Sequence, residues 1–123
     1  MGELFENKVS KTMLMTLQAK ALEGSQKNRL FIDQKAEEMM KQVPSMVSVS
    51  FFDRIGVCLR TKYFDDCCKN FIKTHEHPVI IQLGCGLDDR QGRIGAEDIP
   101  FFSVDFLDVI TLRQEFFEET ATS

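Results

Sequence analysis

Apolar positions in the first 75 residues recur at the three- and four-residue spacing of amphipathic helices. Met13, Leu17 and Ala21 form one such stripe, which predicts a helix that stops at the polar segment 24–28. Asp33 stands where a second helix needs an N-cap. The predicted inner face of that helix comprises Ala36, Met39, Met40 and Val43, with Pro44 just beyond. A third predicted helix carries Phe64, Cys68, Phe71 and Ile72 on one face and is expected to end at 75–78.

The period changes at Val79. The continuous apolar run 79–83 predicts a central parallel strand covered on both faces. A Gly84–Gly86 turn follows, then a short helix or irregular loop over 87–100, then a second strand over 101–104. A last helix should open at Asp108, with its inner face formed by Val109, Leu112, Phe116 and Phe117.

This order of elements predicts the α/β class with two regions. Residues 1–75 form a helical region, and residues 76–123 contain the first two strands and their helices. Two parallel strands do not make a stable sheet, since small sheets usually need three or more strands and cover on both faces. We therefore expect the chain to be truncated, stopping partway through a larger fold.

Composition narrows the function classes. The chain has 123 residues, 43% hydrophobic and 28% charged, with a net charge of −4. Its positive charges are interspersed with negative ones, which argues against a nucleic-acid surface. No apolar run approaches the length of a membrane span, and no signal peptide is evident. A cytoplasmic location without a membrane partner is the resulting expectation.

Cysteines and histidines give no metal-site pattern. The four cysteines (58, 67, 68 and 85) lack paired CxxC spacing, so buried reduced thiols are the favoured interpretation. His75 and His77 share a face if they lie on a strand, but they stand beside Pro78 with no third ligand in view. Solvated loop histidines are the better interpretation, and no metal is expected.

The glycine turn and the acid after the second strand are the main chemical signal. Gly84-Cys85-Gly86 ends the first strand, and Asp105 lies 19 residues beyond Gly86. Glycines admit a ligand close to the backbone, and an acid at the next strand end accepts hydrogen bonds from ribose hydroxyls. The alternative is an ordinary crossover with a solvated acid. Asp88 and Asp89 would repel a pyrophosphate, which favours a cofactor with a ribose and a cationic centre.

Arg60 is a second candidate for ligand binding. It lies in the segment LRTKYFDD (59–66), where a guanidinium can pair with a ligand carboxylate or with Asp65 or Asp66. For an isolated arginine, the internal salt bridge or a solvated charge is the commoner outcome.

Four segments together resemble the leucine carboxyl methyltransferase family, which includes the tetracenomycin-type polyketide O-methyltransferases. VIIQLGCGLDDR (79–90) resembles the family's LGxGLDTR motif, and FSVDFLDVITLR (102–113) its second, acid-containing motif. LRTKYFDD resembles the RTxxxDD stretch. Residues 19–23, followed by Asp33 and Ala36, resemble the N-terminal RAxE…DxxA pattern. The resemblance runs from about residue 12 to 118.

The resemblance implies a Rossmann-like fold that binds S-adenosylmethionine and transfers its methyl group to an oxygen of an acceptor. The turn Gly84, Cys85 and Gly86 would lie under the cofactor, and Asp105 would bind the ribose hydroxyls. Arg60 would hold the methionine carboxylate, which reverses the preference for a solvated arginine, and Lys20 would assist. The acceptor would be a small molecule or a protein carboxylate, and no catalytic residue is indicated.

Three departures from the family pattern bear on activity. Asp89 replaces the usual Thr and adds a negative charge near the site, and Leu107 replaces the usual Pro. Family members are also considerably longer, and their later strands complete the adenine pocket and the acceptor site. Two alternatives therefore stand beside an O-methyltransferase: an inactive remnant that forms a homo-oligomer through its open sheet edge, and a regulatory module that binds an adenine nucleotide.

Overall fold

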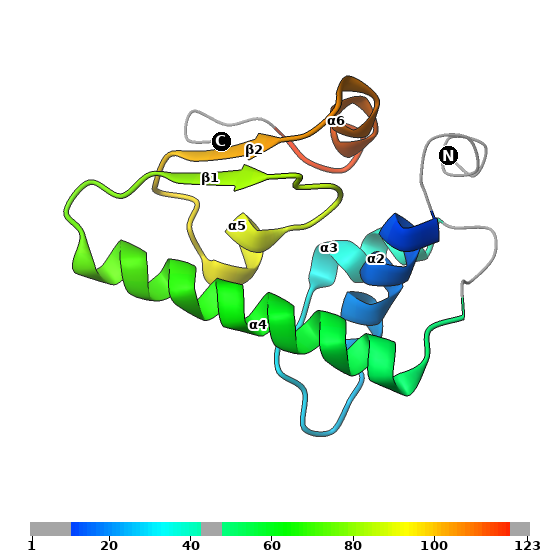
Figure 1. The fold of residues 1–123 in the computed structure, drawn as a ribbon. Coiled ribbons are helices and arrows are strands. Elements are labelled where there is room, and N and C mark those ends of the chain that lie inside the picture. The colour runs from blue at the N-terminus through cyan, green and yellow to red at the C-terminus, as the bar shows by residue number, and fades with distance from the viewer. Residues whose placement is uncertain (1–10, 43–47, 119–123) are drawn as a thin grey trace.

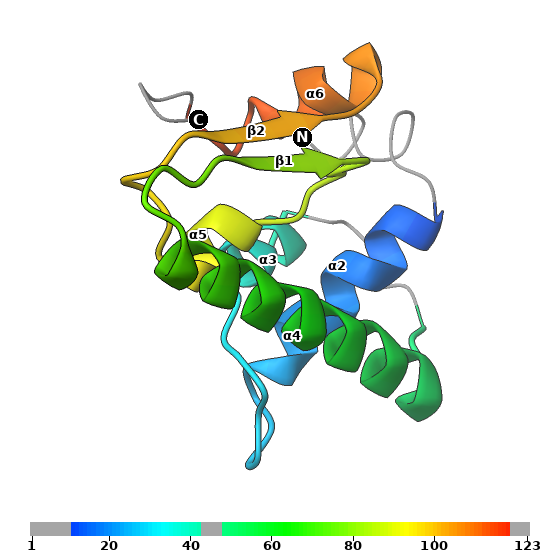
Figure 2. The same ribbon diagram turned by 60° about the vertical axis from the view of Figure 1, so that its left-hand side comes forward.

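The computed structural model describes residues 11–42 and 48–118, with only the backbone of Lys11. Two short parallel strands form one layer, α4 crosses beneath them, and α5 lies between (Figures 1 and 2). The elements in chain order are α2 (Lys11–Glu23), α3 (Gln34–Met40), α4 (Phe51–Thr74), β1 (Ile80–Leu83), α5 (Arg90–Ile94), β2 (Phe101–Val104) and α6 (Leu107–Arg113).

The sheet confirms the predicted parallel pair. Ile80 pairs with Phe101, and the register continues to Leu83 with Val104. The connection between the strands passes through the glycine turn and the five-residue helix α5. Because both strands run in the same direction, their carboxyl ends meet at one edge, next to the glycine turn.

An apolar cluster packs the N-terminal helices against the segment that contains the strands. It is formed by Leu17, Ala36 and Met39 from the helical region together with Leu87 and Leu112 from the βα region. Leu17 and Leu112 are 2% and 0% exposed. The glycine turn is therefore packed, through Leu87, against the helices that precede it in the sequence.

The predicted cap of the second helix is confirmed. Asp33 Oδ1 accepts a hydrogen bond from the backbone N–H of Ala36 at 2.9 Å, which satisfies one of the free donors at the start of α3. The helix ends at Met40, and Val43 and Pro44 lie outside the described residues. α4 is capped in the same way by Ser50, whose hydroxyl accepts from Asp53 N–H.

The apolar face predicted for α4 is only partly buried, with Cys68 and Ile72 half-buried. Phe64 and Phe71 are 43% and 41% exposed, whereas Cys58, Thr61 and Asp65 are the buried residues of this helix. Asp65 is buried because two arginines of the α5 segment pair with it. Apolar spacing alone does not reveal such a face, since ion pairing determines which side of the helix turns inward.

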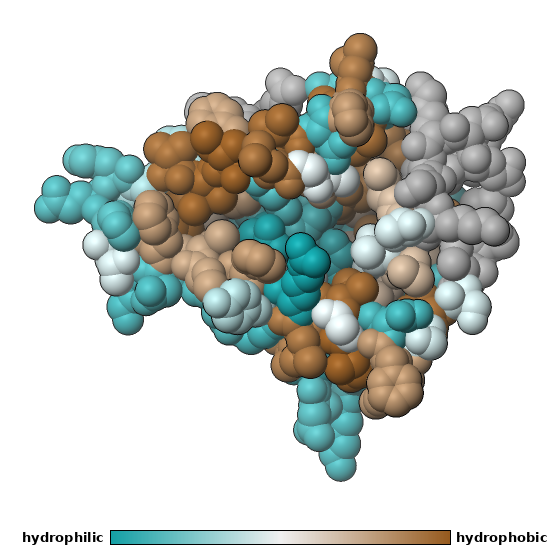
Figure 3. All heavy atoms as spheres, viewed as in Figure 1, coloured by the Kyte–Doolittle hydropathy of each residue, from teal (hydrophilic) through white to brown (hydrophobic). Residues whose placement is uncertain are grey.

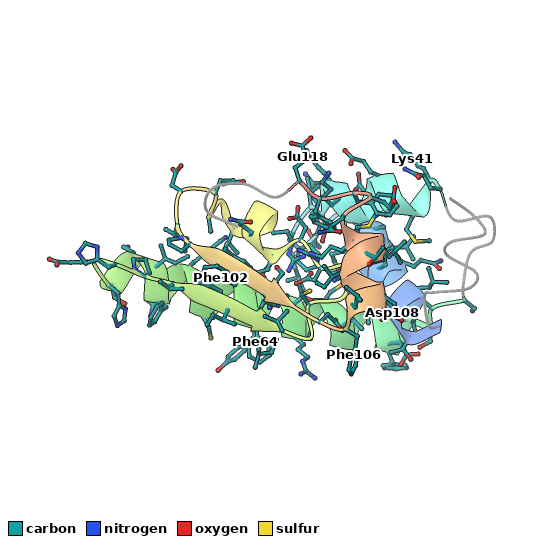
Figure 4. All side chains as sticks on the ribbon, turned by 90° about the horizontal axis from the view of Figure 1, so that it is seen from above. Lys41, Phe64, Phe102, Phe106, Asp108 and Glu118 are labelled. Carbon is teal, nitrogen blue, oxygen red and sulfur yellow. The ribbon has the colours of Figure 1, made fainter. Side chains whose placement is uncertain are left out.

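The expectation that β1 is covered on both faces is also wrong for the part of the chain described. Ile81 and Leu83 are 62% and 77% exposed, and Phe102 on β2 is 53% exposed. Apolar side chains gather over the strands in Figure 3, and none of the helices in the described part of the chain lies over the strands when they are seen from above in Figure 4. We call the exposed surface formed by Val79, Ile81, Leu83, Phe102 and Val104 the outer sheet face.

The last helix differs from its prediction only at its ends. It begins at Leu107, one residue before Asp108, and ends at Arg113. Val109 and Leu112 are buried as predicted, while Phe116 and Phe117 follow the helix and pack against the core while partly buried. No helix within residues 11–42 and 48–118 is long and apolar enough to cross a membrane.

Two of the four cysteines depart from the expected burial. Cys58 and Cys85 are buried free thiols, but Cys67 is exposed and Cys68 is half-buried. Adjacent residues on a helix point about 100° apart, so Cys67 and Cys68 on α4 do not share one environment.

Candidate cofactor site

The turn after β1 has the backbone geometry that requires glycine. Gly84 and Gly86 have φ angles of 63° and 52°, in the left-handed region. A Cβ atom at Gly84 would meet nothing within 4 Å, so the space beside the turn is open. Side chains at both positions would place strain in the backbone and take up space that a ligand needs.

Asp105 holds this turn against the end of β2. Its Oδ2 accepts a hydrogen bond from Gly86 N–H at 2.8 Å, and its Oδ1 accepts from Phe106 N–H at 2.8 Å. The backbone N–H of Cys85 also donates to the carbonyl of Val104 at 3.1 Å. Asp105 and the glycine turn, 19 positions apart, thus form one structural unit.

Arg113 supports the turn from the other side. Its Nη1 donates to the carbonyl of Gly86 at 3.1 Å and to that of Asp88 at 2.7 Å. These hydrogen bonds were not predicted from the sequence, where Arg113 is only the last residue of the segment that resembles the second family motif. Its position at the end of α6 brings it back to the turn, which only the packing of that helix determines.

A cavity of about 740 Å³ opens between the turn, β1 and the helices α2 and α4. In the space-filling view, polar residues lie between the apolar surface over the strands and α4 (Figure 3). The wall of the cavity includes all six residues expected at a cofactor site: Lys20, Arg60, Gly84, Cys85, Gly86 and Asp105. Lys20 and Asp105 are 85 positions apart in the sequence, and the packing of α2 and α4 against the strand segment brings these residues to the same cavity.

The two basic residues on the wall differ in environment. Arg60 is exposed, and its guanidinium lies 5.7 Å from the ring centre of Phe64. Its candidate internal partners pair with other residues. Asp65 Oδ1 lies 2.9 Å from Arg90 Nε, and Asp66 Oδ1 lies 2.8 Å from Lys62 Nζ. Arg60 therefore forms no salt bridge within the described residues, and its charge is available at the cavity wall.

Lys20 is buried and paired. Its side chain is 8% exposed, and Nζ lies 2.7 Å from Asp88 Oδ1. Burial by itself would raise the pKa of Asp88, but the charges of Lys20 and Arg93 outweigh burial and hold this pKa well below its usual range. Asp88 is therefore a carboxylate at neutral pH, and it fixes Lys20 at the floor of the cavity.

An ion network centred on Arg93 stands behind this wall. The Arg93 side chain is 2% exposed and contacts Asp33, Asp65 and Asp88, with nearest N–O distances of 2.7, 2.8 and 2.6 Å. Burial opposes its charge, but hydrogen bonds to Asp65 and Asp88 outweigh this effect and raise the pKa of Arg93. The network joins the start of α3, the middle of α4 and the glycine-turn segment.

Sequence reasoning missed the Arg93 network. An arginine four residues after Asp89 is unremarkable by spacing alone. The available signal was the number of acids in the resembled motifs, since Asp33, Asp65 and Asp88 all fall within them and buried acids require cationic partners.

Asp89 does not lie on the cavity wall. It caps α5, with Oδ1 accepting from Gly92 N–H at 3.2 Å, and it borders a separate hollow of about 260 Å³ beside β2. Burial, followed by the charge of Asp33, raises the pKa of Asp89 to about 6. The extra carboxyl group of Asp89 is therefore near the cavity in sequence but is not part of its wall, where Asp88 lies instead.

The histidines lie away from the cavity. His75 and His77 are exposed, and His75 stacks on Phe71 with ring centres 4.0 Å apart. Within residues 11–42 and 48–118 there is no cluster of three or more histidine, cysteine or acidic side chains that would hold a metal ion.

Comparison with known proteins identifies the family. A family model of leucine carboxyl methyltransferases matches residues 12–123. The chain belongs to this family. Members of the leucine carboxyl methyltransferase family use S-adenosylmethionine and have a Rossmann-like fold, consistent with the parallel sheet and the turn described above.

Two curated proteins are similar to this family member over most of its length. The tetracenomycin polyketide synthesis O-methyltransferase TcmP of Streptomyces glaucescens is 33% identical, covering 90% of this chain and 43% of the relative. The S-adenosyl-L-methionine-dependent methyltransferase dpfgK of Gibberella zeae is 28% identical, covering 98% and 45%. The chain thus spans less than half the length of these relatives. No solved structure gives a significant match.

Proposed function

We propose that this chain binds S-adenosylmethionine in the 740 Å³ cavity and forms the cofactor-binding part of an O-methyltransferase. The observation that supports the proposal best is the convergence of Lys20, Arg60, the glycine turn and Asp105 on one wall. Residues 1–75 contribute the two cations, and residues 76–123 contribute the turn and the acid.

The residues present are suited to such a cofactor. The cavity volume falls within the roughly 300–1,000 Å³ of small-molecule sites. Open space beside Gly84 admits a ligand to the backbone of the turn. Cations for a carboxylate and an acid for ribose hydroxyls are both on the wall.

Asp105 keeps the capacity to bind hydroxyls while it holds the turn. Each of its oxygens accepts one backbone hydrogen bond, and each carboxylate oxygen has a second lone pair. Two vicinal hydroxyls of a ribose match this pair of acceptors. The tie to Gly86 fixes the carboxylate before the ligand arrives, so that little order is lost on binding.

Arg60 and Lys20 supply positive charge for the methionine carboxylate. Arg60 presents a planar fork that suits a carboxylate in bidentate geometry. Lys20 uses one ammonium hydrogen for Asp88 and retains two further donors. The exposed Arg60 closes onto the ligand, whereas the buried Lys20 is already in place.

The cofactor supplies a methyl group already activated by its sulfonium, so the protein has to bind and orient the reactants. The acceptor atom in this proposal is an oxygen, of a carboxylate or a hydroxyl. Either a small molecule, such as the polyketide implied by the name of the Streptomyces relative, or a protein carboxylate meets that requirement.

Isothermal titration with S-adenosylhomocysteine tests the proposal. We expect saturable binding by the wild-type chain and weaker binding by Asp105→Ala and Arg60→Ala. Lys62→Ala on the same helix and Asp108→Asn at the start of α6 are matched controls, because neither residue lies on the cavity wall. Equal affinity in all five proteins, or tighter binding of ATP than of S-adenosylhomocysteine, would contradict the proposal.

A second candidate function is supported by the outer sheet face. Its exposed apolar side chains, with Leu83 77% and Phe102 53% exposed, suit self-association of an inactive chain. Sedimentation velocity over a range of concentrations tests this possibility. Association that Phe102→Glu abolishes would support it, and a monomer at all concentrations would contradict it.

A further inference from the structure

One side of α4 faces away from the core and carries apolar side chains. Phe52, Leu59 and Tyr63 are 82%, 53% and 65% exposed, and Gly56 and Cys67 on the same side are also exposed. We call these five residues the α4 stripe. They recur at three- and four-residue spacing, so they form one row along about four turns, opposite the buried residues of this helix. Single exposed apolar residues are ordinary, but a continuous row of them marks an interaction surface.

The α4 stripe is complementary to itself when two copies of the helix lie antiparallel. A two-fold axis beside Leu59, at the middle of the stripe, places Gly56 of one copy opposite Tyr63 of the other, and Phe52 opposite Cys67. A large side chain therefore meets a small residue at each of these levels. The Tyr63 ring has room there, because a Cβ atom at Gly56 would meet nothing within 4 Å.

The same arrangement follows the rules of helix packing. Positions 52, 56 and 60 form one ridge at four-residue spacing, and positions 59, 63 and 67 form the next. The two-fold axis packs the first ridge of one copy against the second ridge of the other. Contacts between ridges at four-residue spacing are the commonest class of helix packing in globular proteins.

The charged residues beside the stripe permit this pairing. Lys62 and Asp66 neutralise each other on one flank, with Nζ and Oδ1 2.8 Å apart. Asp53 and Asp66, which the axis brings to the same level, lie on opposite flanks, because thirteen residues turn a helix by roughly 220° beyond full turns. Arg60 comes near its own copy at the axis, but its guanidinium lies 5.7 Å from the Phe64 ring, on the cavity side of the helix.

We propose that this chain forms an antiparallel dimer through the α4 stripe. A second copy is the partner because the large and small residues of the stripe match each other. The exposed parts of Phe52, Leu59 and Tyr63 amount to about 400 Å² per copy. A standard interface buries about 800 Å² per partner, so the dimer should be weak and form at micromolar concentrations or above. Arg60 and Phe64 remain at the cavity, so the dimer is compatible with cofactor binding.

Sedimentation velocity over a range of concentrations tests which surface is used. The proteins are the wild type, Tyr63→Glu, Gly56→Gln and the matched control Phe102→Glu, which places the same charge on the outer sheet face. We expect Tyr63→Glu to weaken association by about tenfold or more, since it buries a charge in an apolar interface, and Phe102→Glu to leave association unchanged.

Gly56→Gln separates an effect on the interface from an effect on folding. Glutamine is a better helix former than glycine and has open space at this position, so the midpoint of thermal unfolding should rise. Its side chain occupies the space that Tyr63 of the second copy needs, so association should weaken. A variant that merely folded badly would show a lower midpoint instead.

Chemical crosslinking with a short bismaleimide tests the antiparallel orientation. We expect Phe52→Cys to be linked to the native Cys67 of the second copy, and peptide mapping identifies this linkage. The wild type should give no crosslink between its two Cys67 residues, which lie about 22 Å apart along the antiparallel helices. The double variant Phe52→Cys with Cys67→Ser is the control and should give no crosslinked dimer.

Three results would overturn the inference. The first is a wild-type chain that stays monomeric at millimolar concentration. The second is association that Phe102→Glu abolishes and Tyr63→Glu leaves intact, which would assign the dimer to the outer sheet face. The third is a crosslink between the two Cys67 residues of the wild type, which would require parallel helices.

Discussion

Substituting Arg93 by Met tests whether the buried ion network stabilises the fold. The side chain makes five hydrogen bonds to three carboxylates. Met preserves much of the apolar length but removes the charge. Among the described residues, this leaves Lys20 and Arg90 as the cationic partners of Asp65 and Asp88, and none for Asp33.

The expected loss is large compared with the stability of a small domain. Removing one partner of a buried ion pair costs about 3–5 kcal/mol, and domains unfold with about 5–15 kcal/mol. Five charged hydrogen bonds would sum to more, but they share one guanidinium and are not additive. For a chain of this size we expect the midpoint of thermal unfolding to fall by more than about 10 °C.

Circular dichroism melts of the wild type, Arg93→Met, Arg93→Lys and Lys62→Met measure this effect. Arg93→Lys keeps the charge but loses the planar guanidinium group, so its unfolding midpoint should lie between those of the wild type and Arg93→Met. Lys62→Met breaks an exposed pair with Asp66, worth about 0.3–0.5 kcal/mol, and should change the midpoint little. A midpoint for Arg93→Met within about 2 °C of wild type would refute the reasoning, since it would show no net contribution.

Three further predictions concern the turn, the pH response and the thiols. Gly84→Val should cost about 1–2 kcal/mol, because φ is 63°, and it should abolish S-adenosylhomocysteine binding in calorimetry while the chain remains folded. The pKa of Asp89 is raised to about 6, so the folded chain binds more protons than the unfolded chain between about pH 4 and 6. Stability should therefore fall as pH rises through that range, and urea unfolding of Asp89→Asn, which can still cap α5, should lack this decline. A thiol reagent should modify exposed Cys67 first and Cys58 only after unfolding. The reason is that burial, and then Glu23, raise the pKa of Cys58 to about 12. Early labelling of Cys58, detected by mass spectrometry, would contradict its buried position.

Local rules were enough for the strands, the turn and the Asp33 cap. Apolar runs, glycines and capping side chains act over a few residues, so Val79–Leu83, Gly84 and Asp33 could be assigned without tertiary information. The cofactor-binding residues were predicted from the resemblance to the family motifs. That they line one cavity depends on how the helices pack, which sequence spacing alone does not predict.

The inner face of α4 could not be predicted because its burial depends on distant charges. Asp65 turns inward to meet Arg90 and Arg93, 25 and 28 positions away, and this turns Phe64 outward. Distant contacts also distinguish Asp88 from Asp89, although the two are neighbours in sequence. Asp88 pairs with Lys20, whereas Asp89 caps α5. The spacing of apolar residues does not predict which charged side chains will pair across such distances.

The Arg93 network also bears on the order in which the chain folds. Its partners lie 60, 28 and 5 positions before Arg93, so full neutralisation requires α3, α4 and the glycine-turn segment to be in place together. Contacts of such long separation form after local helices, since loop closure has to precede them. If the network forms late in folding, Arg93→Met should raise the unfolding rate more than it lowers the folding rate. We expect the part of the cavity wall that Lys20 and Asp88 form against Arg93 to open mainly when the whole domain unfolds, rather than by local fluctuation.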